Sequence, residues 1–204
     1  MLFDDTYRTI QKPAEGQFSD RGSKFISYAF PVNNENEVKP LLLQIKAAHP
    51  KAGHHCWALR LTPNRSIFRI NDDGEPSGTA GRPILNTLLS QDITNVLIVV
   101  VRYFGGTLLG VPGLINAYKV ATEEAVKHAV IVEKTVNDIY TVNFDHVQMN
   151  DVMRIIKENN LTTLEQEFDN RCMITLSVRQ LQVNAVLGKL NALEEVKVKF
   201  LRSN

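Results

Sequence analysis

The chain of 204 residues lacks several features that would assign it to a familiar class at once. It has two cysteines, Cys56 and Cys172, which lie far apart and belong to no Cys-x-x-Cys pair. This spacing argues against a disulfide framework and leaves a structural zinc site without ligands. Both cysteines fall in apolar, strand-like runs, so we interpret them as small buried residues.

Long apolar segments and an excess of charge are also missing. The longest aliphatic run is Val96–Val101, whereas a membrane-spanning helix needs about 20 residues. The start, Met1–Asp5, is acidic and has no apolar signal core, so we expect a cytoplasmic protein without a membrane partner. The net charge of +1 lacks the basic surplus of proteins that hold long duplex DNA, so any nucleic acid must be bound by local groups.

Residues 1–133 show a mixture of strand and helix patterns that predicts one α+β domain. Asn33 and Asn34 precede acidic residues and an apolar periodic run, which indicates an Asn-capped helix that ends at Pro50. The other expected elements are strands 25–30, 55–61, 66–70 and 96–104 and helices 84–89 and 114–128.

Residues 134–204 show a different pattern, which predicts a second domain with a boundary near 134. The expected order is strand 139–144, helix 147–159, strand 162–168, strand 172–178, helix 181–193 and strand 196–200. This order is that of the ferredoxin-like βαββαβ unit. The helical apolar residues are interpreted as core. They are Val152, Ile155, Ile156, Val183, Val186, Leu187 and Leu190.

Two glycine-rich loops carry the chemistry that the sequence offers. The first, Asn71–Pro83, follows a strand and opens a helix, where free N–H groups favour an anion. Ser77 and Thr79 could cap that helix or donate to a phosphate, and Arg82 could make a fork contact to one. Two alternatives remain open: the acidic residues could simply cap backbone amides within a structural turn, or they could hold a hard cation.

The second loop, Arg102–Gly113, lies between a buried strand and a helix, where such folds place ligands. Gly105 and Gly106 suggest a nest of backbone amides for an anion. Tyr103 and Phe104 offer rings for base stacking, although core packing is expected for one of the two. Neither loop fits the Walker A or Gly-x-Gly-x-x-Gly pattern, so an ATPase or a dinucleotide enzyme is poorly supported.

Residues upstream of the loops add further candidates. His54 and His55 would point to opposite faces of a strand, so they cannot easily share one site, and a catalytic pair of Cys56 with either histidine is not favoured. We expect His54 to line the loop site. Lys24 is a candidate phosphate contact, although a solvated lysine at a strand end is an equal alternative.

At these loops the sequence resembles the YigZ/IMPACT family. The stretch from Asp72 to Leu85 is similar to the family signature, and so are Val100–Gly106, Leu109-Gly110 and Ala117-Tyr118. Lys24-Phe25 and His54 also fit, and the resemblance covers nearly the whole chain. The sequence departs from the family pattern at Pro112, which replaces a glycine and deletes one N–H, and at Asn116, where the family often has arginine.

The resemblance implies a fold for each domain and a role in translation. Residues 1–133 would resemble the second domain of ribosomal protein S5, and residues 134–204 a ferredoxin-like module of elongation factor G. The eukaryotic relatives restrain a translational stress kinase through its activator, but they carry an extra N-terminal domain that the first residues here do not resemble. We therefore do not expect this chain to bind the activator of that kinase.

We expect a non-enzymatic protein that binds RNA or the ribosome through the two loops and regulates translation or a stress response. The alternatives are a hydrolase acting on a small phosphorylated or peptide substrate, and an adaptor whose C-terminal domain binds a protein. No catalytic residue, cofactor or metal ion is predicted, and the oligomeric state is open. The predicted ligand-binding residues are Lys24, His54, Asp73, Glu75, Ser77, Gly78, Thr79, Gly81, Arg82, Arg102, Tyr103, Gly105, Gly106 and Gly110.

Overall fold

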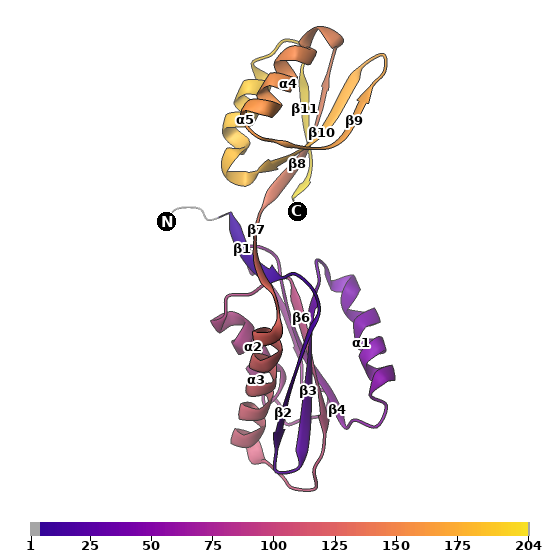
Figure 1. Ribbon diagram of the computed structural model, residues 1–204, viewed down its shortest axis with the longest axis vertical. Coiled ribbons are helices and arrows are strands. Elements are labelled where there is room, and N and C mark those ends of the chain that lie inside the picture. The colour runs from indigo at the N-terminus through magenta and orange to yellow at the C-terminus, as the bar shows by residue number, and fades with distance from the viewer. Residues whose placement is uncertain (1–4, 204) are drawn as a thin grey trace. The chain divides into compact units, whose positions relative to one another are not determined.

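The computed structural model describes residues 5–203 and divides the chain into two compact units. One unit is Tyr7–Lys134, and the other joins Thr135 and the residues after it to Asp5 and Thr6. The protein therefore has a mixed α and β fold with two units (Figure 1). Residues 1–4, which belong to the start that was expected to lack an apolar signal core, lie outside the described part of the chain. No helix within residues 5–203 is long and apolar enough to span a membrane.

The N-terminal unit is built on an antiparallel five-stranded sheet with the order β2-β3-β6-β4-β5. Its strands are β2 (Ala14–Asp20), β3 (Ser23–Pro31), β4 (His54–Leu61), β5 (Ile67–Asn71) and β6 (Val96–Tyr103). Its helices are α1 (Val38–Ala48), α2 (Gly81–Ser90) and α3 (Gly110–His128). A separate two-stranded sheet pairs β1 (Thr6–Ile10) with β7 (Ile131–Thr135).

Helices cover both faces of this sheet, and the sequence of β6 shows why. Its residues Val96–Val101 are all fully buried, because alternate side chains enter two separate cores. Val96, Ile98 and Val100 pack in the core that includes residues of α2 and α3. Leu97, Val99 and Val101 pack on the other side with α1 (Figure 1). The predicted continuous buried strand is confirmed.

The ends of the helices follow local sequence, with one correction. Asn34 caps a 3₁₀ turn, Glu35–Glu37, that leads into α1. The sequence predicted an Asn-capped helix at this place. The second loop, however, was expected to run to Gly113, and α3 already begins at Gly110. Pro112 is compatible with this earlier start. Backbone N–H groups in the first turn of a helix have no partner within the helix, so a proline, which has no N–H, costs no hydrogen bond there.

Strand β2 was not predicted, since its sequence AEGQFSD has no β-branched residue. Tertiary packing explains it. A Cβ on Gly16 would lie 2.3 Å from the backbone N of Ala125, so α3 packs directly against the β2 backbone. Only glycine permits this close approach.

The C-terminal unit has the predicted order of strands and helices. Its sheet has the order β11-β8-β10-β9, and each pair is antiparallel. The strands are β8 (Asn137–Phe144), β9 (Thr162–Phe168), β10 (Cys172–Arg179) and β11 (Lys197–Ser203). Helices α4 (Met149–Glu158) and α5 (Val183–Asn191) follow 3₁₀ turns at His146–Gln148 and Gln180–Gln182 and share one core with the sheet. The helical residues predicted as core all pack there.

Asp5 is tied to this second unit. Its buried carboxylate accepts hydrogen bonds from Nε and Nη2 of Arg179 and from the backbone N–H of Leu181. The hydrogen bond from Arg179 lowers the pKa of Asp5 below its ordinary value. Val136 also donates its N–H to the carbonyl of Asp5. These bonds explain why Asp5 belongs with residues far along the chain.

Candidate functional site at one end of the N-terminal sheet

Strand register brings the predicted loops to one end of the N-terminal sheet. Phe25, Arg102 and His54 stand side by side on β3, β6 and β4. The first loop reaches the same end, because Glu75 contacts Arg102 and His54 contacts Asp73. The two loops therefore lie near each other at this end of the sheet.

The first loop is held together by Asp72. Its carboxylate accepts hydrogen bonds from the backbone N–H groups of Gly78 (2.8 Å), Ala80 (3.1 Å) and Gly81 (2.8 Å). Thr79 is buried and its hydroxyl donates to the carbonyl of Pro76. The amides expected to bind a phosphate thus have an internal carboxylate partner. This corrects the predicted roles of Gly78, Thr79 and Gly81, and it is the structural-turn alternative that the sequence left open.

Glu75 and Arg102 form a buried ion pair. The Nη1 of Arg102 lies 2.7 Å from Oε1 of Glu75, and their side chains are 7% and 3% exposed. The hydroxyl of Tyr118 donates to the same oxygen at 2.7 Å. Burial raises the pKa of Tyr118, so it stays a neutral donor. These two predicted ligand-binding residues therefore hold each other, which corrects both assignments.

His54 stands at the edge of this network. Its Nδ1 lies 2.8 Å from the carbonyl oxygen of Asp73, so we assign the proton to Nδ1, which donates to that carbonyl. Its Nε2 faces Glu75 Oε1 at 3.9 Å, and the side chain is 28% exposed. The carboxylate of Asp73 also has partners within the protein. It accepts a hydrogen bond from the backbone N–H of His55 at 2.7 Å and lies 3.6 Å from Lys46 Nζ.

Cys56 lies in the same network but is not a nucleophile. Burial raises the pKa of its thiol far above its usual range. The thiol donates to the carbonyl of Asp72 at 3.0 Å and lies 3.3 Å from the hydroxyl of Tyr118. A protonated thiol reacts poorly, so this residue gives the hydrolase alternative no support. Among the described residues, no group of three or more His, Cys, Asp or Glu side chains is placed to hold a metal ion.

Lys24 and Tyr103 belong to the opposite side of the sheet. They pair across β3 and β6 at the position next to Phe25 and Arg102, so their side chains point toward α1. The hydroxyl of Tyr103 lies 2.8 Å from Nδ1 of His49, whose Nε2 lies 2.7 Å from the hydroxyl of Tyr28. Tyr103 is thus the ring that packs, and Lys24 does not share a face with His54.

The second loop is fixed by contact with the turn between β2 and β3. A Cβ on Gly105 would lie 1.9 Å from the backbone of Gly22, and the N–H of Gly105 donates to the hydroxyl of Ser23. Gly106 and Gly110 have positive φ values of 87° and 71°, and both are exposed. Gly105 therefore serves packing, whereas Gly106 is a glycine at the surface.

Phe104 is an exposed ring on a rigid support. It is 56% exposed, and its ring centroid lies 5.7 Å from Cζ of Arg102. The ring of Phe25 lies on Arg102 as well, at 5.5 Å. Because Glu75 anchors Arg102, the guanidinium holds Phe104 from below by a cation–π contact. The outer side of the ring is left to solvent.

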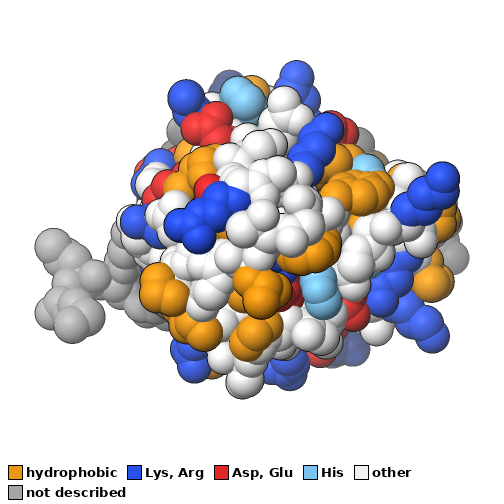
Figure 2. Space-filling view, turned by 90° about the horizontal axis from the view of Figure 1, so that it is seen from below, with side chains coloured by type: hydrophobic (Ala, Val, Ile, Leu, Met, Phe, Trp, Pro, Cys, Tyr) orange, Lys and Arg blue, Asp and Glu red, His pale blue; other side chains and the backbone are white. Residues whose placement is uncertain are grey.

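Apolar side chains continue from Phe104 along α3. Val111 and Ile115 of α3 are 52% and 40% exposed and, being four residues apart, lie on one side of the helix, and Leu108 just before the helix is 81% exposed. Figure 2 views the molecule from the lower end of Figure 1 and shows hydrophobic side chains at several places on that end, with Lys and Arg side chains between and around them. Exposed apolar groups of this number are typical of a surface that binds a macromolecule.

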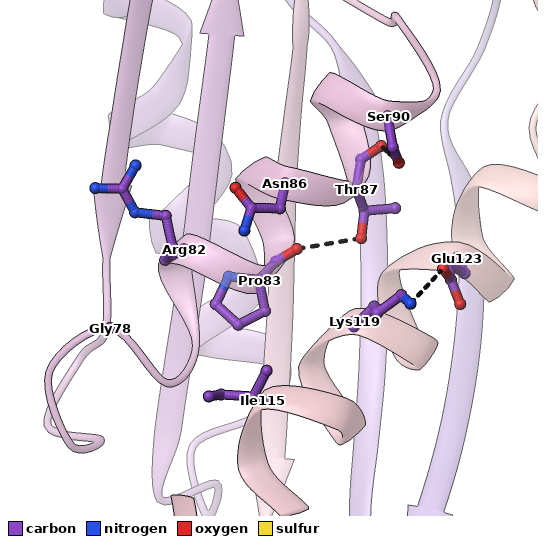
Figure 3. A pocket seen from close by; sticks show the side chains of 9 residues that line it. All are labelled: Gly78, Arg82, Pro83, Asn86, Thr87, Ser90, Ile115, Lys119 and Glu123. Atoms are coloured by element: carbon purple, nitrogen blue, oxygen red, sulfur yellow. Dashed lines mark hydrogen bonds and ion pairs between the residues drawn. The ribbon is translucent and has the colours of Figure 1, made fainter. Parts of the chain in front are cut away.

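A shallow groove of about 460 Å³ extends from this surface between α2 and α3 (Figure 3). Its lining residues are Gly78, Arg82, Pro83, Asn86, Thr87, Ser90, Ile115, Lys119 and Glu123. Lys119 pairs with Glu123 at 3.8 Å. Arg82 is exposed and forms no ion pair with any residue in 5–203, so it is an available cation. Ser77 is exposed close by in the sequence.

Sequence reasoning missed Asp72, Tyr118 and Ile115. The sequence presents Asp72 only as one of several acidic residues that could cap amides, whereas in the structure its carboxylate accepts hydrogen bonds from three N–H groups. Tyr118 is marked only by the family resemblance at Ala117-Tyr118, because a tyrosine at a helical core position is otherwise interpreted as packing. An exposed Ile115 cannot be told from a buried one until the neighbouring helix is placed.

The fold and this site define a two-unit mixed α and β protein with a glycine-loop surface. The family model described as the Impact N-terminal domain matches residues 21–126. The chain belongs to the IMPACT family. It is 32% identical over 180 residues to the IMPACT family member YvyE of Bacillus subtilis, covering 88% of this chain and 83% of that protein.

Two further comparisons agree with this assignment. An IMPACT family member of Haemophilus influenzae is 32% identical over 170 residues, with 82% of each chain covered. A crystal structure of a protein described only as hypothetical matches with a TM-score of 0.73 and 24% identity, covering 98% of this chain and 99% of that one. At that identity the structural match supports the fold alone.

Proposed function

We propose that this chain is a non-enzymatic, cytoplasmic regulator of translation that binds RNA on the ribosome through the loop end of its N-terminal unit. The finer fold assignments are part of the proposal: a unit like the second domain of ribosomal protein S5, followed by a ferredoxin-like unit. The βαββαβ order and the sheet order β11-β8-β10-β9 support the second of these. The role in translation follows the family resemblance.

The observation that carries the proposal is the ring of Phe104. A base stacks best on an aromatic face that is exposed and held in place, because little side-chain entropy is then lost on binding. Phe104 meets both conditions, being 56% exposed over a guanidinium that Glu75 fixes. The exposed glycine Gly106 follows two residues later and leaves room for a nucleotide backbone.

Phosphate contacts would come from few cations. Arg82 is available at the groove, whereas Arg102 is committed to Glu75. With a net charge of +1, we expect two or three phosphate contacts and hence a shallow dependence of affinity on salt, with a logarithmic slope of about −2. The proposal thus favours single-stranded or looped RNA, where stacking contributes more than charge.

Fluorescence anisotropy with a labelled RNA hairpin that has a single-stranded loop tests the proposal directly. We expect micromolar affinity for the full chain. Phe104→Ala should weaken binding about tenfold, since one base stack contributes roughly 1–3 kcal/mol. Arg82→Ala should weaken it less and flatten the salt slope by about one.

The matched controls are Phe68→Ala and Arg69→Ala. Phe68 is 48% exposed on the edge strand β5, and Arg69 is an exposed arginine beside it that pairs with Glu35. Neither control should change the affinity. Equal losses of affinity for Phe104→Ala and Phe68→Ala would reject the proposal. It would also be rejected if the unmodified chain showed no binding in low salt at about 100 μM, a concentration well above the expected micromolar range.

A further inference from the structure

The sheet of the C-terminal unit has one face that no helix in the described chain covers. Alternate residues of β8 and β10, such as Val142 and Ile174, enter the core with α4 and α5 (Figure 1). The intervening residues point to the other face. Asp5 reaches one end of that face through Arg179, and farther along β10 the face carries Thr175 and Met173.

Strand register defines two rows across this open face. The first row runs Lys199, Thr141, Thr175, Glu165 over β11, β8, β10 and β9. The second row runs Lys197, Asn143, Met173, Glu167. Each row therefore begins with a lysine on one edge strand and ends with a glutamate on the other.

This separation of charge is not explained within a single copy. Opposite charges stabilise a sheet when they stand on neighbouring strands, but here two strands separate them, a distance of about 14 Å. All four charged side chains are exposed, and none forms an ion pair with another residue in 5–203. The basic edge and the acidic edge thus remain without partners, with the sheltered Thr175 between them.

We propose that a second copy of this chain binds here, face to face. A two-fold axis parallel to the strands turns β11 of one copy over β9 of the other. Because each lysine shares a row with a glutamate, Lys199 then meets the partner's Glu165 and Lys197 meets the partner's Glu167, twice over. Thr141 meets the partner's Thr175, and these short side chains let the two sheets approach to the usual separation of about 10 Å.

The interface is self-complementary, as a two-fold dimer requires. One sheet face gives an interface on the order of 1,000 Å² in total, which lies at the weak end of specific interfaces. We therefore expect a dissociation constant of about 10–100 μM. Its ion pairs lie at the rim, so the dimer should dissociate as salt is raised.

Sedimentation velocity of the full chain tests this dimer with charge-reversed variants. We expect K197E/K199E alone and E165K/E167K alone to be monomers at concentrations where the unmodified chain dimerises. A one-to-one mixture of the two variants should recover association, because each basic edge then faces an acidic one. The control K157E/K189E changes two exposed lysines on α4 and α5 and should leave the dimer intact.

Three results would overturn the proposal. In the first, the unmodified chain stays monomeric at about 200 μM in low salt. In the second, each charge-reversed variant dimerises as the unmodified chain does. In the third, the two variants stay monomeric when they are mixed. Circular dichroism of each variant establishes that it is folded. None of these measurements involves RNA, so they stand or fall separately from the proposed function.

Discussion

The two units treat polar groups at their sheets in opposite ways. In the N-terminal unit helices cover both faces, and the charged groups at the sheet end are consumed internally: Asp72 by amides, Glu75 by Arg102 and Tyr118. In the C-terminal unit helices cover one face, and Lys199 and Glu165 remain exposed on the other. The acidic residues of the first glycine-rich loop therefore serve the structure of the N-terminal unit. In the C-terminal unit, the charges that remain available for binding stand on β9 and β11, whose sequences carry no motif.

A substitution at Glu75 should give the largest effect on stability in either unit. Glu75→Gln should destabilise the N-terminal unit by about 3–5 kcal/mol, because it leaves the Arg102 charge buried without its partner. Urea unfolding followed by fluorescence of Trp57, the single tryptophan and a residue of β4, reports on this unit alone. The control is Glu35→Gln, whose exposed pair with Arg69 should contribute less than about 1 kcal/mol. Similar losses for the two variants would contradict the structural role of the buried pair.

Glycines of the two units should respond with opposite signs. Gly16→Ala forces a Cβ into the α3 backbone and should destabilise the N-terminal unit by about 1–3 kcal/mol. Gly188 lies inside α5 with nothing within 4 Å of its Cβ position, so Gly188→Ala should stabilise the C-terminal unit by up to about 1 kcal/mol. Hydrogen exchange of β8 amides measures the second change. Destabilisation by both substitutions would show that α5 is packed more tightly than described.

The smallest expected effect is a dependence of stability on pH from His55. Burial lowers the pKa of His55 below its ordinary value. The unfolded state therefore binds a proton more readily than the folded state, and stability falls as pH drops through about 6.5. His55→Gln should reduce the loss of stability between pH 7 and pH 5, measured by the Trp57 unfolding midpoint. An unchanged pH profile would assign the loss to other groups.

Much of the fold could be predicted from the sequence, because its strongest signals are local. The aliphatic run at Val96 and the Asn34 cap determine β6 and the start of α1 directly. Strand β2 was missed because Gly16 serves a contact with Ala125, more than 100 residues later. Propensity says nothing about such a contact.

The candidate site was predicted less well, for a physical reason. A sequence shows which residues could bind a phosphate, but not whether another residue already occupies them. Arg102 and Glu75 both look like ligand groups until the fold places them 2.7 Å apart. Arg82 is exposed at the groove, but Tyr103, the ring predicted to bind a ligand, is hydrogen-bonded to His49 on the opposite side of the sheet, and Phe104 is the exposed ring instead.

The central claim is that RNA binds at the loop end of the N-terminal unit, and an NMR titration tests it most directly. The full chain labelled with ¹⁵N is titrated with the RNA hairpin, and amide shifts are mapped. The account predicts that shifts concentrate at Phe104, Gly106 and Arg82, with the β8–β11 sheet unchanged. Shifts confined to that sheet, or the same shifts in Phe104→Ala as in the unmodified chain, would contradict it.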